Sequence, residues 1–148
     1  MKISIQTEDF SLQQESDRLR ELSSDTGAIV TFVGLVRDLD KDAKVSSLFL
    51  EHYPGMTEKS LALISEQAQQ RWPLIDTTII HRIGELKASE QIVFVGVSSR
   101  HRDAAFAACE FMMDYLKSQA PFWKKTRDET GEHWVAAKDS DEAAAKRW

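Results

Sequence analysis

Alternating and continuous runs of apolar, β-branched and aromatic residues predict a series of strands along the chain. The N-terminal run "KISIQT" alternates, so that Ile3 and Ile5 share one face of a strand. The predicted strands cover residues 2–7, 28–37, 45–53, 76–83, 91–99, 122–127 and 133–137. Between two of them, the polar stretch at 38–44 predicts a loop, and "GELKASE" at 84–90 predicts a hairpin connection.

Apolar residues that recur every three or four positions predict helices between these strands. Ser11 can cap a first helix, and Thr57 can cap a second, which Pro73 ends. The run at 101–117 is long and heavily apolar, as expected of a buried helix, and the tail of the chain ends in a short basic helix. The order of the elements predicts a single α+β domain over residues 1–148, with an antiparallel or mixed sheet.

Composition excludes several classes of protein. The formal net charge of −5 argues against a protein that coats nucleic acid or an anionic membrane, because both need a basic surface. A single cysteine, Cys109, excludes an intramolecular disulfide framework and a cysteine-rich zinc site. The N-terminus lacks an apolar signal-peptide core, and no stretch approaches ~20 consecutive apolar residues. We therefore expect a cytoplasmic protein without a membrane span.

The segment "SSRHRD" (98–103) places positive charge at a helix N-terminus, where acidic residues are normally favoured. Arg100, His101 and Arg102 open this helix, and either preceding serine can cap it. Unpaired backbone N–H groups and arginine side chains together bind phosphate or carboxylate well. The alternative is that these residues pair with acidic side chains elsewhere in the fold, and the segment alone leaves both interpretations open.

The segment "VGLVRD" (33–38) offers a second anion site at the end of a strand. Gly34 inside the strand indicates a place where another group approaches the backbone closely. The main chain of Leu35 and Val36 would then line a pocket, and the Arg37 guanidinium would bind a phosphate or carboxylate. The alternative is an arginine at the sheet edge that pairs with an aspartate just after it.

The stretch "DYLKSQAPFWKK" (114–125) gathers lysines around a proline and two aromatic residues. Lys117 follows Asp114 by three positions, so a solvated ion pair at a helix C-terminus is one explanation for it. The aromatic turn after it is costly to expose and should pack, which would carry Lys124 and Lys125 with it. Burial beside aromatic surface lowers the pKa of a lysine toward the range that suits a nucleophile or proton donor.

Other reactive side chains favour structural roles. Cys109 lies in the middle of a helix among apolar residues and is expected to be a small core residue. His52 and His81 stand at strand ends without the spacing of metal ligands, so no metal site is predicted. No Ser-His-Asp set or dinucleotide-binding fingerprint is present, and no cofactor is expected.

Long and idiosyncratic sequence blocks run through nearly the whole chain, from about Gly27 to Trp148. They are "VTFVGLVRD", "LEHYPGMTEKSL", "RWPL", "IIHRIGEL", "IVFVGVSSRHRDAAFAACEFMMDYLKSQAPFWKK" and "AAAKRW". Together these blocks closely resemble the large, catalytic subunits of molybdopterin synthase, the MoaE family. The resemblance implies an α/β hammerhead-like fold.

The resemblance also implies a sulfurtransferase activity. Such subunits install the dithiolene sulfurs of molybdopterin on cyclic pyranopterin monophosphate, also called precursor Z. The sulfur arrives as a thiocarboxylate on the Gly-Gly C-terminus of a small ubiquitin-like partner, whose tail enters a pocket of the large subunit. Two large subunits form a homodimer at the centre of a heterotetramer. Molybdenum enters later, so the resemblance implies no metal.

Residue roles follow from the same resemblance, position by position. The lysines of "DYLK" and "PFWK" that the family uses in catalysis are Lys117 and Lys124. The substrate-binding positions are Leu35, Val36, Arg37, His101, Arg102, Lys125 and Thr126. Many relatives carry an acid where this chain has Thr126, so an acidic role at that position is not carried over.

Two functions of other classes would use the same residues. One is a non-catalytic sensor that binds an anionic metabolite at Arg37, His101 and Arg102. The other is a scaffold that binds the ubiquitin-like partner without chemistry. Both leave the substrate and the partner chemically unchanged, which distinguishes them from a sulfurtransferase.

Overall fold

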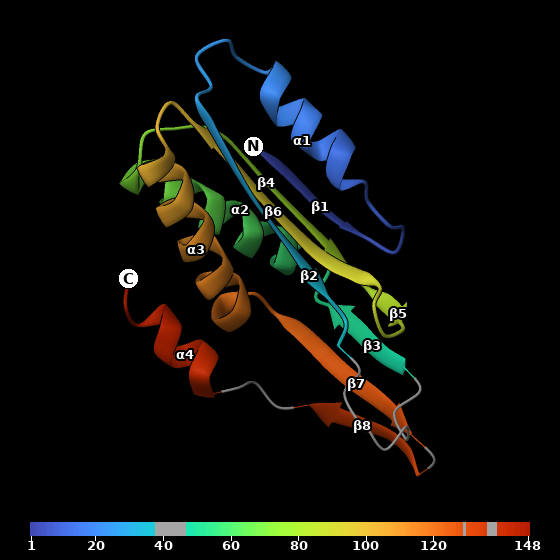
Figure 1. Ribbon diagram of the computed structural model, residues 1–148. Coiled ribbons are helices and arrows are strands. Elements are labelled where there is room, and N and C mark those ends of the chain that lie inside the picture. Colours follow the sequence, from blue (N-terminus) through green and yellow to red (C-terminus); the bar gives the residue numbers. More distant parts are fainter. Residues whose placement is uncertain (38–46, 129, 136–138) are drawn as a thin grey trace.

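The computed structural model describes residues 1–37, 47–128, 130–135 and 139–148 (Figure 1). Its strands are β1 (Lys2–Gln6), β2 (Ala28–Leu35), β3 (Ser47–His52), β4 (Leu74–Arg82), β5 (Gly84–Leu86), β6 (Gln91–Ser99), β7 (Phe122–Asp128) and β8 (Gly131–Val135). Its helices are α1 (Leu12–Glu21), α2 (Met56–Arg71), α3 (Arg102–Gln119) and α4 (Asp139–Ala145). The predicted loop at 38–44 lies outside the described residues.

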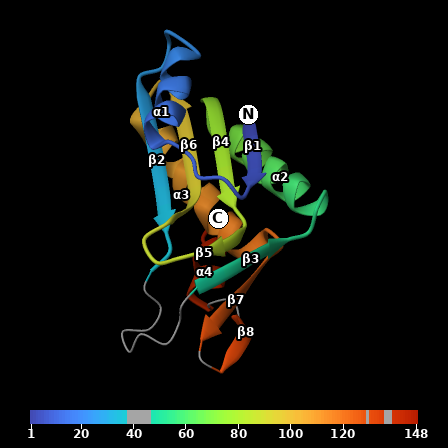
Figure 2. The same ribbon diagram turned by 90° about the vertical axis from the view of Figure 1, so that its right-hand side faces the viewer.

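Two four-stranded sheets form the framework of the fold. Sheet A has the strand order β1-β4-β6-β2, in which β1 runs parallel to β4 and the other pairs are antiparallel. Sheet B has the order β5-β3-β7-β8 and is antiparallel throughout. Helix α1 covers one face of sheet A, and α2 and α3 cover the other (Figure 1 and Figure 2). The predicted α+β fold with a mixed sheet is confirmed, with two sheets where the sequence indicated one.

Helix α1 packs on sheet A through Leu19, which is fully buried. The Ser11 hydroxyl accepts a hydrogen bond from the Gln14 N–H (3.2 Å), as expected of the predicted cap. Leu19 lies over Gly96 of β6, where an added Cβ would come within 2.7 Å of the leucine Cδ1 atom. The missing side chain at Gly96 therefore sets how closely α1 approaches the sheet.

The main core lies on the other face of sheet A. Alternate residues of β6, including Val93 and Val95, point toward α2 and α3 and pack with Phe111. Cys109 of α3 belongs to this core, with its Sγ atom 3.9 Å from the main-chain oxygen of Val95. Burial raises the pKa of the Cys109 thiol to about 12. The prediction that Cys109 is a core residue is confirmed.

The predicted cap of α2 is wrong by two positions. Gly55 precedes the first turn, and its N–H donates to the Glu58 carboxylate (2.5 Å). Thr57 is buried inside the helix instead. Its hydroxyl accepts a hydrogen bond from the Tyr53 N–H (2.9 Å) and donates one to the carbonyl oxygen of Pro121 (3.0 Å). The residue read as a cap therefore joins α2 to the segment after α3.

The predicted serine cap of α3 is also wrong. His101 occupies the N-cap position, and neither Ser98 nor Ser99 bonds the first turn through its side chain. The Ser99 hydroxyl donates to the main-chain oxygen of His101 instead. This segment packs against Gly27, where an added Cβ would lie 2.2 Å from the carbonyl oxygen of Arg100. Close backbone contact thus fixes where α3 begins.

Residues 84–90, predicted as a plain hairpin connection, contain the short strand β5. This strand pairs with β3, with Leu86 opposite Leu48, and both leucines are buried. Gly84 adopts a positive φ of 88°, which a residue with a side chain rarely adopts. The chain can therefore leave β4 of sheet A and enter sheet B without a long loop.

Trp148 anchors the end of the chain to α3. Its ring contacts Trp72 and Phe111 edge-on, with 5.7 Å and 5.8 Å between ring centroids. Its Nε1 donates to the Asp114 carboxylate (2.6 Å), and Arg71 donates to its main-chain oxygen (3.0 Å). Helix α4 is thereby held against α3. Across the described residues, each helix is too short or too polar to cross a membrane.

Leu19→Ala should lower the free energy of unfolding by about 2–5 kcal/mol, because it leaves a cavity over Gly96. Leu12→Ala in the same helix is the matched control. Leu12 is 43% exposed, so its loss should cost under about 1 kcal/mol. Urea unfolding followed by circular dichroism measures both. Equal losses in the two variants would contradict this packing of α1.

Candidate active site

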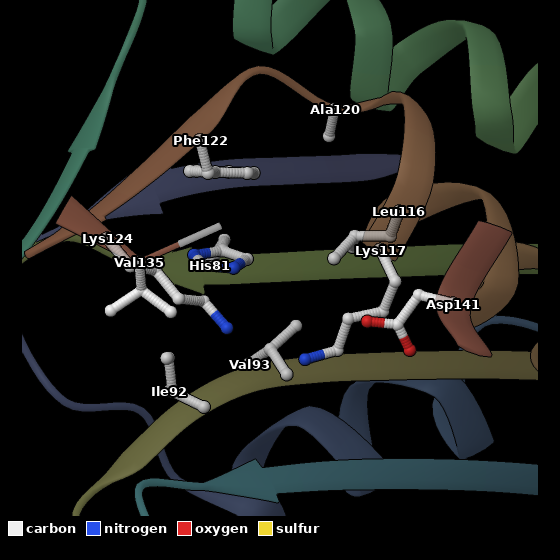
Figure 3. Close-up of a pocket in the computed structure, with 10 residues that line it drawn as sticks. All are labelled: His81, Ile92, Val93, Leu116, Lys117, Ala120, Phe122, Lys124, Val135 and Asp141. Carbon is white, nitrogen blue, oxygen red and sulfur yellow. The ribbon is translucent and has the colours of Figure 1, made fainter. Parts of the chain in front are cut away.

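A cavity of about 210 Å³ lies beside the last turns of α3, where sheet A meets sheet B (Figure 3). The residues that line it are His81, Ile92, Val93, Leu116, Lys117, Ala120, Phe122, Lys124, Val135 and Asp141. Most of the lining is apolar, with two lysines, one histidine and one aspartate among it. Such a combination of apolar walls and few polar groups is typical of a ligand site.

Lys117 and Lys124 enter this cavity from different elements. Lys117 lies in the last turn of α3 and Lys124 lies on β7. Figure 3 shows their amine ends directed toward one another. Lys117 is exposed, whereas Lys124 is half-buried. The fold thus brings together the two lysines that the sequence marked as catalytic, and two facing ammonium groups favour an anionic ligand.

A tight turn makes this convergence possible. Ala120 leaves the helical conformation (φ −85°, ψ 131°), and Pro121 cannot continue the helix. The Thr57 hydroxyl holds the carbonyl oxygen of Pro121, and β7 begins at the next residue. Phe122 packs into the cavity wall, but Trp123 is 44% exposed. The prediction that the whole aromatic turn packs is therefore met only in part.

Successive side chains of β7 point to opposite faces of sheet B. Lys124 faces the cavity, so Lys125 faces away from it. The Nζ atom of Lys125 lies 3.6 Å from a carboxylate oxygen of Glu51 and 4.2 Å from the ring centroid of Trp134. Lys125 therefore has partners of its own on the outer face of the sheet.

Lys125 and Thr126 line a second, smaller cavity of about 70 Å³. Thr126 stands opposite Leu48 of β3 and His133 of β8. These two predicted substrate-flanking residues are therefore adjacent in sequence to Lys124 but lie at a different cavity.

His81 lies near the end of β4 and is buried in the wall of the larger cavity. Its ring stacks on Phe122 with 3.8 Å between centroids and an interplanar angle of 18°. Its Nδ1 atom lies 2.8 Å from the main-chain oxygen of Arg82. Burial, together with the nearby charges of Lys117 and Lys124, lowers the pKa of His81 to about 4. The ring is therefore neutral near pH 7.

The strand-end segment at 35–37 lies at the same end of sheet A as the cavity. The Val36 N–H donates to the Glu90 carbonyl (2.9 Å), and the Val36 carbonyl accepts from the Ser89 N–H (2.7 Å). Val36 is buried in the core, whereas Leu35 and Arg37 are exposed. Arg37 is not among the described residues that line the cavity.

His101 and Arg102 lie at the opposite end of α3 from Lys117. The 15 positions from 102 to 117 span about 22 Å at ~1.5 Å per residue. Both side chains are exposed. A single chain therefore does not bring them to the lysine cavity. Their neighbour Arg100 pairs with Asp25 (3.0 Å), as the structural interpretation of this segment predicted.

Asp114, read from the sequence as a surface partner of Lys117, has other partners. Its Oδ2 atom accepts hydrogen bonds from Arg147 (2.9 Å) and from Nε1 of Trp148 (2.6 Å). Arg147 also bonds Glu110 (2.8 Å). Among the described residues no salt bridge joins Asp114 to Lys117. The acidic stripe of α3 is thus covered by the C-terminal segment.

Comparison with known proteins identifies the family of this chain. Residues 5–119 match the family described as MoaE protein. The chain belongs to the MoaE family. A molybdopterin synthase catalytic subunit of Vibrio cholerae serotype O1 is 56% identical over 147 residues, which cover 99% of this chain and 97% of that protein. The subunit of the same name from Escherichia coli strain K12 is 53% identical over 147 residues, with coverages of 99% and 97%.

A solved structure from the MoaE family has the same fold. The molybdopterin biosynthesis MoaE protein of Burkholderia ambifaria matches with a TM-score of 0.86 at 51% identity, and the match covers 100% of this chain and 98% of that one. The fold expected from the family resemblance is therefore confirmed. Within the described part of this MoaE chain, no group of three or more His, Cys, Asp or Glu side chains is placed to hold a metal ion.

Sequence patterns did not identify His81 and Asp141 as cavity residues of this MoaE chain. His81 follows the core residue Ile79 by two positions on β4, so the two side chains point to the same face of the strand. Strand alternation therefore indicated that His81 faces the core. No such signal exists for Asp141. Helix α4 packs against α3, and the contacts of Trp148 with Trp72 and Phe111 help to hold it there.

The burial of His81 predicts an unusual titration. NMR titration of the folded protein should give His81 a pKa near 4, against ~6.5 for the chain unfolded in urea. Because the unfolded state binds this proton first, lowering the pH from ~6.5 to ~4 should reduce stability by up to about 3 kcal/mol through this residue. A folded-state pKa near 6.5 would contradict the buried, neutral ring.

Proposed function

We propose that this chain is the catalytic subunit of a molybdopterin synthase, a sulfurtransferase of molybdenum cofactor biosynthesis. In this reaction, sulfur from a carrier thiocarboxylate is transferred to cyclic pyranopterin monophosphate and forms the dithiolene of molybdopterin. One observation carries the proposal. Lys117 and Lys124 meet in one cavity, in a chain that is 56% identical to a molybdopterin synthase catalytic subunit.

The two lysines supply positive charge where negative charge gathers in this reaction. A thiocarboxylate is anionic, and its reaction develops an oxyanion, so Lys117 and Lys124 stabilise both. One of them also gives or takes a proton at the carbon atoms that receive sulfur. The apolar side chains of Val93, Leu116 and Phe122 line the same cavity and strengthen these electrostatic interactions by limiting water.

The sulfur comes from outside this chain. Its one cysteine, Cys109, is buried in the core, and burial raises the pKa of the thiol to about 12. A buried, protonated thiol is a poor sulfur carrier, because the thiolate is the reactive form. We assign the donor role to a small ubiquitin-like subunit with a Gly-Gly C-terminus, whose thiocarboxylate tail enters the lysine cavity.

A second copy of the chain supplies His101 and Arg102 to each site. Within one copy, about 22 Å along α3 separates these residues from Lys117. A homodimer of large subunits allows the start of one α3 to lie beside the cavity of the other copy. Exposed apolar side chains on β2 and α3 offer a surface for this contact: Phe32, Leu35 and Phe106 are 39%, 54% and 61% exposed.

The remaining assignments belong to the same proposal. Arg37 takes the substrate phosphate beside the cavity, and the main chain of Leu35 and Val36 lines its approach. Lys125 and Thr126 flank the route of the partner's tail. The chain acts as one domain over residues 1–148, in the cytoplasm, without a metal or cofactor of its own.

Lys117→Ala and Lys124→Ala should each lower the rate of molybdopterin formation by about 100-fold or more, because each removes a cation from the reacting centre. The assay combines the variant, the thiocarboxylated carrier and precursor Z, and quantifies the product by mass spectrometry. Lys59→Ala is the control, since Lys59 is exposed on α2 away from the cavity. Its rate should stay within about twofold of the wild type.

Full turnover by Lys117→Ala would exclude the proposed role of this lysine. Binding of both reactants by the wild type without any product would instead indicate a sensor or a scaffold. The assay therefore separates a wrong residue assignment from a wrong function.

Mixed dimers test the contribution of the second copy. Lys117→Ala and His101→Ala homodimers should both be weakly active, since each site lacks one group. A heterodimer purified with two different tags has one site with both groups intact, so it should recover about half of the wild-type rate. No recovery in the heterodimer would place both residues at a site within one chain, against the separation along α3.

A further inference from the structure

The proposed mechanism gives no role to His81, a polar residue of the cavity lining. His81 is only 6% exposed, yet it lines the cavity that holds Lys117 and Lys124. Its ring is fixed by two contacts, the stack on Phe122 at 3.8 Å and the hydrogen bond to the Arg82 carbonyl at 2.8 Å. A histidine held in this way presents its second nitrogen in one direction.

Arg82 is itself held in place, so its carbonyl oxygen is a fixed partner for the Nδ1 atom of His81. The Arg82 guanidinium donates hydrogen bonds to the main-chain oxygens of Thr7 (3.0 Å) and Gln91 (2.9 Å). It therefore ties the end of β4 to both neighbouring segments. The carbonyl oxygen that receives the His81 proton is thus part of a rigid strand end.

The partner of Nδ1 decides the tautomer of His81. A carbonyl oxygen only accepts hydrogen bonds, so the neutral ring carries its proton on Nδ1. Nε2 then has a lone pair and no proton. Figure 3 shows the His81 ring in the cavity wall, close to the side chain of Lys124. Among the described residues, no hydrogen bond is made to Nε2.

Burial and the charges around the ring keep it in this state. Burial disfavours a positive charge on His81 most, and Lys117 of α3, Lys124 of β7 and His52 of β3 act in the same direction. The cavity therefore contains a neutral acceptor beside two cations and the carboxylate of Asp141. Among the described residues, His81 Nε2 is not one of the buried side-chain atoms that lack a partner, so it opens onto the cavity, where the donor group of a ligand can reach it.

We propose that His81 is a substrate-positioning residue, whose Nε2 accepts a hydrogen bond from an N–H or O–H group of a reactant bound between Lys117 and Lys124. The inference rests on the proposed function and adds a polarity requirement to it. The lysines select for negative charge, and His81 selects for a donor beside that charge. A reactant without the donor leaves Nε2 unpaired and is bound less well.

Two reactants of the proposed reaction carry such donors. The pterin substrate has ring and exocyclic N–H groups, and an extended Gly-Gly tail has backbone N–H groups. The chemistry at Nε2 is the same for both. Adding each reactant alone shows which of the two donates the hydrogen bond to Nε2.

Paired substitutions test the acceptor. His81→Phe keeps a flat ring against Phe122 but removes Nε2, and it should lower kcat/KM by about tenfold or more. His81→Gln places an amide oxygen near the position of Nε2, and it should restore most of this loss. His52→Gln is the control, because His52 pairs with Glu58 (3.2 Å) and does not line the cavity. Thermal unfolding shows whether each variant folds.

Equal kcat/KM for wild type and His81→Phe would overturn the inference. So would a folded His81→Gln that is as impaired as His81→Phe, since the ring would then act only by packing. If the wild type itself makes no molybdopterin, the proposed function fails instead. The two failures are therefore distinguishable.

The role of His81 can also be tested on the wild-type protein, without any substitution. With ¹⁵N-labelled histidine, the Nε2 resonance of His81 should shift in the direction of hydrogen-bond acceptance when its donor binds. Addition of precursor Z alone or of the carrier alone identifies which reactant supplies the donor. An unchanged resonance at saturation with both reactants would overturn the inference.

Discussion

The arrangement of the candidate site depends on one hydrogen bond, from the Thr57 hydroxyl to the carbonyl oxygen of Pro121. It fixes the turn between α3 and β7 to the first turn of α2. If the helix continued instead, positions 117 and 124 would lie about 10 Å apart along one axis. Because the chain reverses here, Lys117 and Lys124 approach the same space from two sides. The turn between α3 and β7 therefore brings the two lysine charges together.

Ion pairs outside the cavity occupy the acids of α3 that lead to Lys117, and Asp141 is the acid among the described residues that line it. The net charge is −5, and α3 carries Glu110 and Asp114 on the face that leads to Lys117. Arg147 and Trp148 bind these carboxylates and so draw their charge toward the C-terminal segment. A free carboxylate close to Lys117 would otherwise offset the positive charge that this lysine offers to a ligand. The end of the chain thus contributes to the electrostatics of the site twice, through these pairs on α3 and through Asp141 in the cavity lining.

Local patterns predicted most of the fold, because helices and strands follow from the spacing of apolar residues. The Ser11 cap was also visible in the sequence, because its partner, the Gln14 N–H, lies only three residues away. Thr57 was misread, since a hydroxyl near a helix start looks like a cap when its distant partner, Pro121, is unknown. Strand β5 was missed because its stability comes from pairing with β3 and from little in its own three residues.

The candidate site was predictable where its residues are close in sequence. Lys117 and Lys124 belong to one short segment, and family resemblance assigned their roles. The full set of site residues was not predictable, because sequence patterns do not give the distances between residues in the fold. His101 looked like a member of the same site, yet α3 carries it away from the lysines. Asp141 reaches the cavity through tertiary packing alone, whereas strand alternation indicated only that His81 faces the core.

The pleat of β7 has a consequence for how relatives of this chain are compared. Deletion of one residue between Pro121 and Lys124 would preserve the number of lysines and the net charge. It would also exchange the two faces of the strand, so that Lys124 would meet Glu51 and Lys125 would enter the cavity. An alignment that merely finds two lysines is therefore insufficient. The distance from the proline to the lysine, three residues here, decides whether the pair is retained.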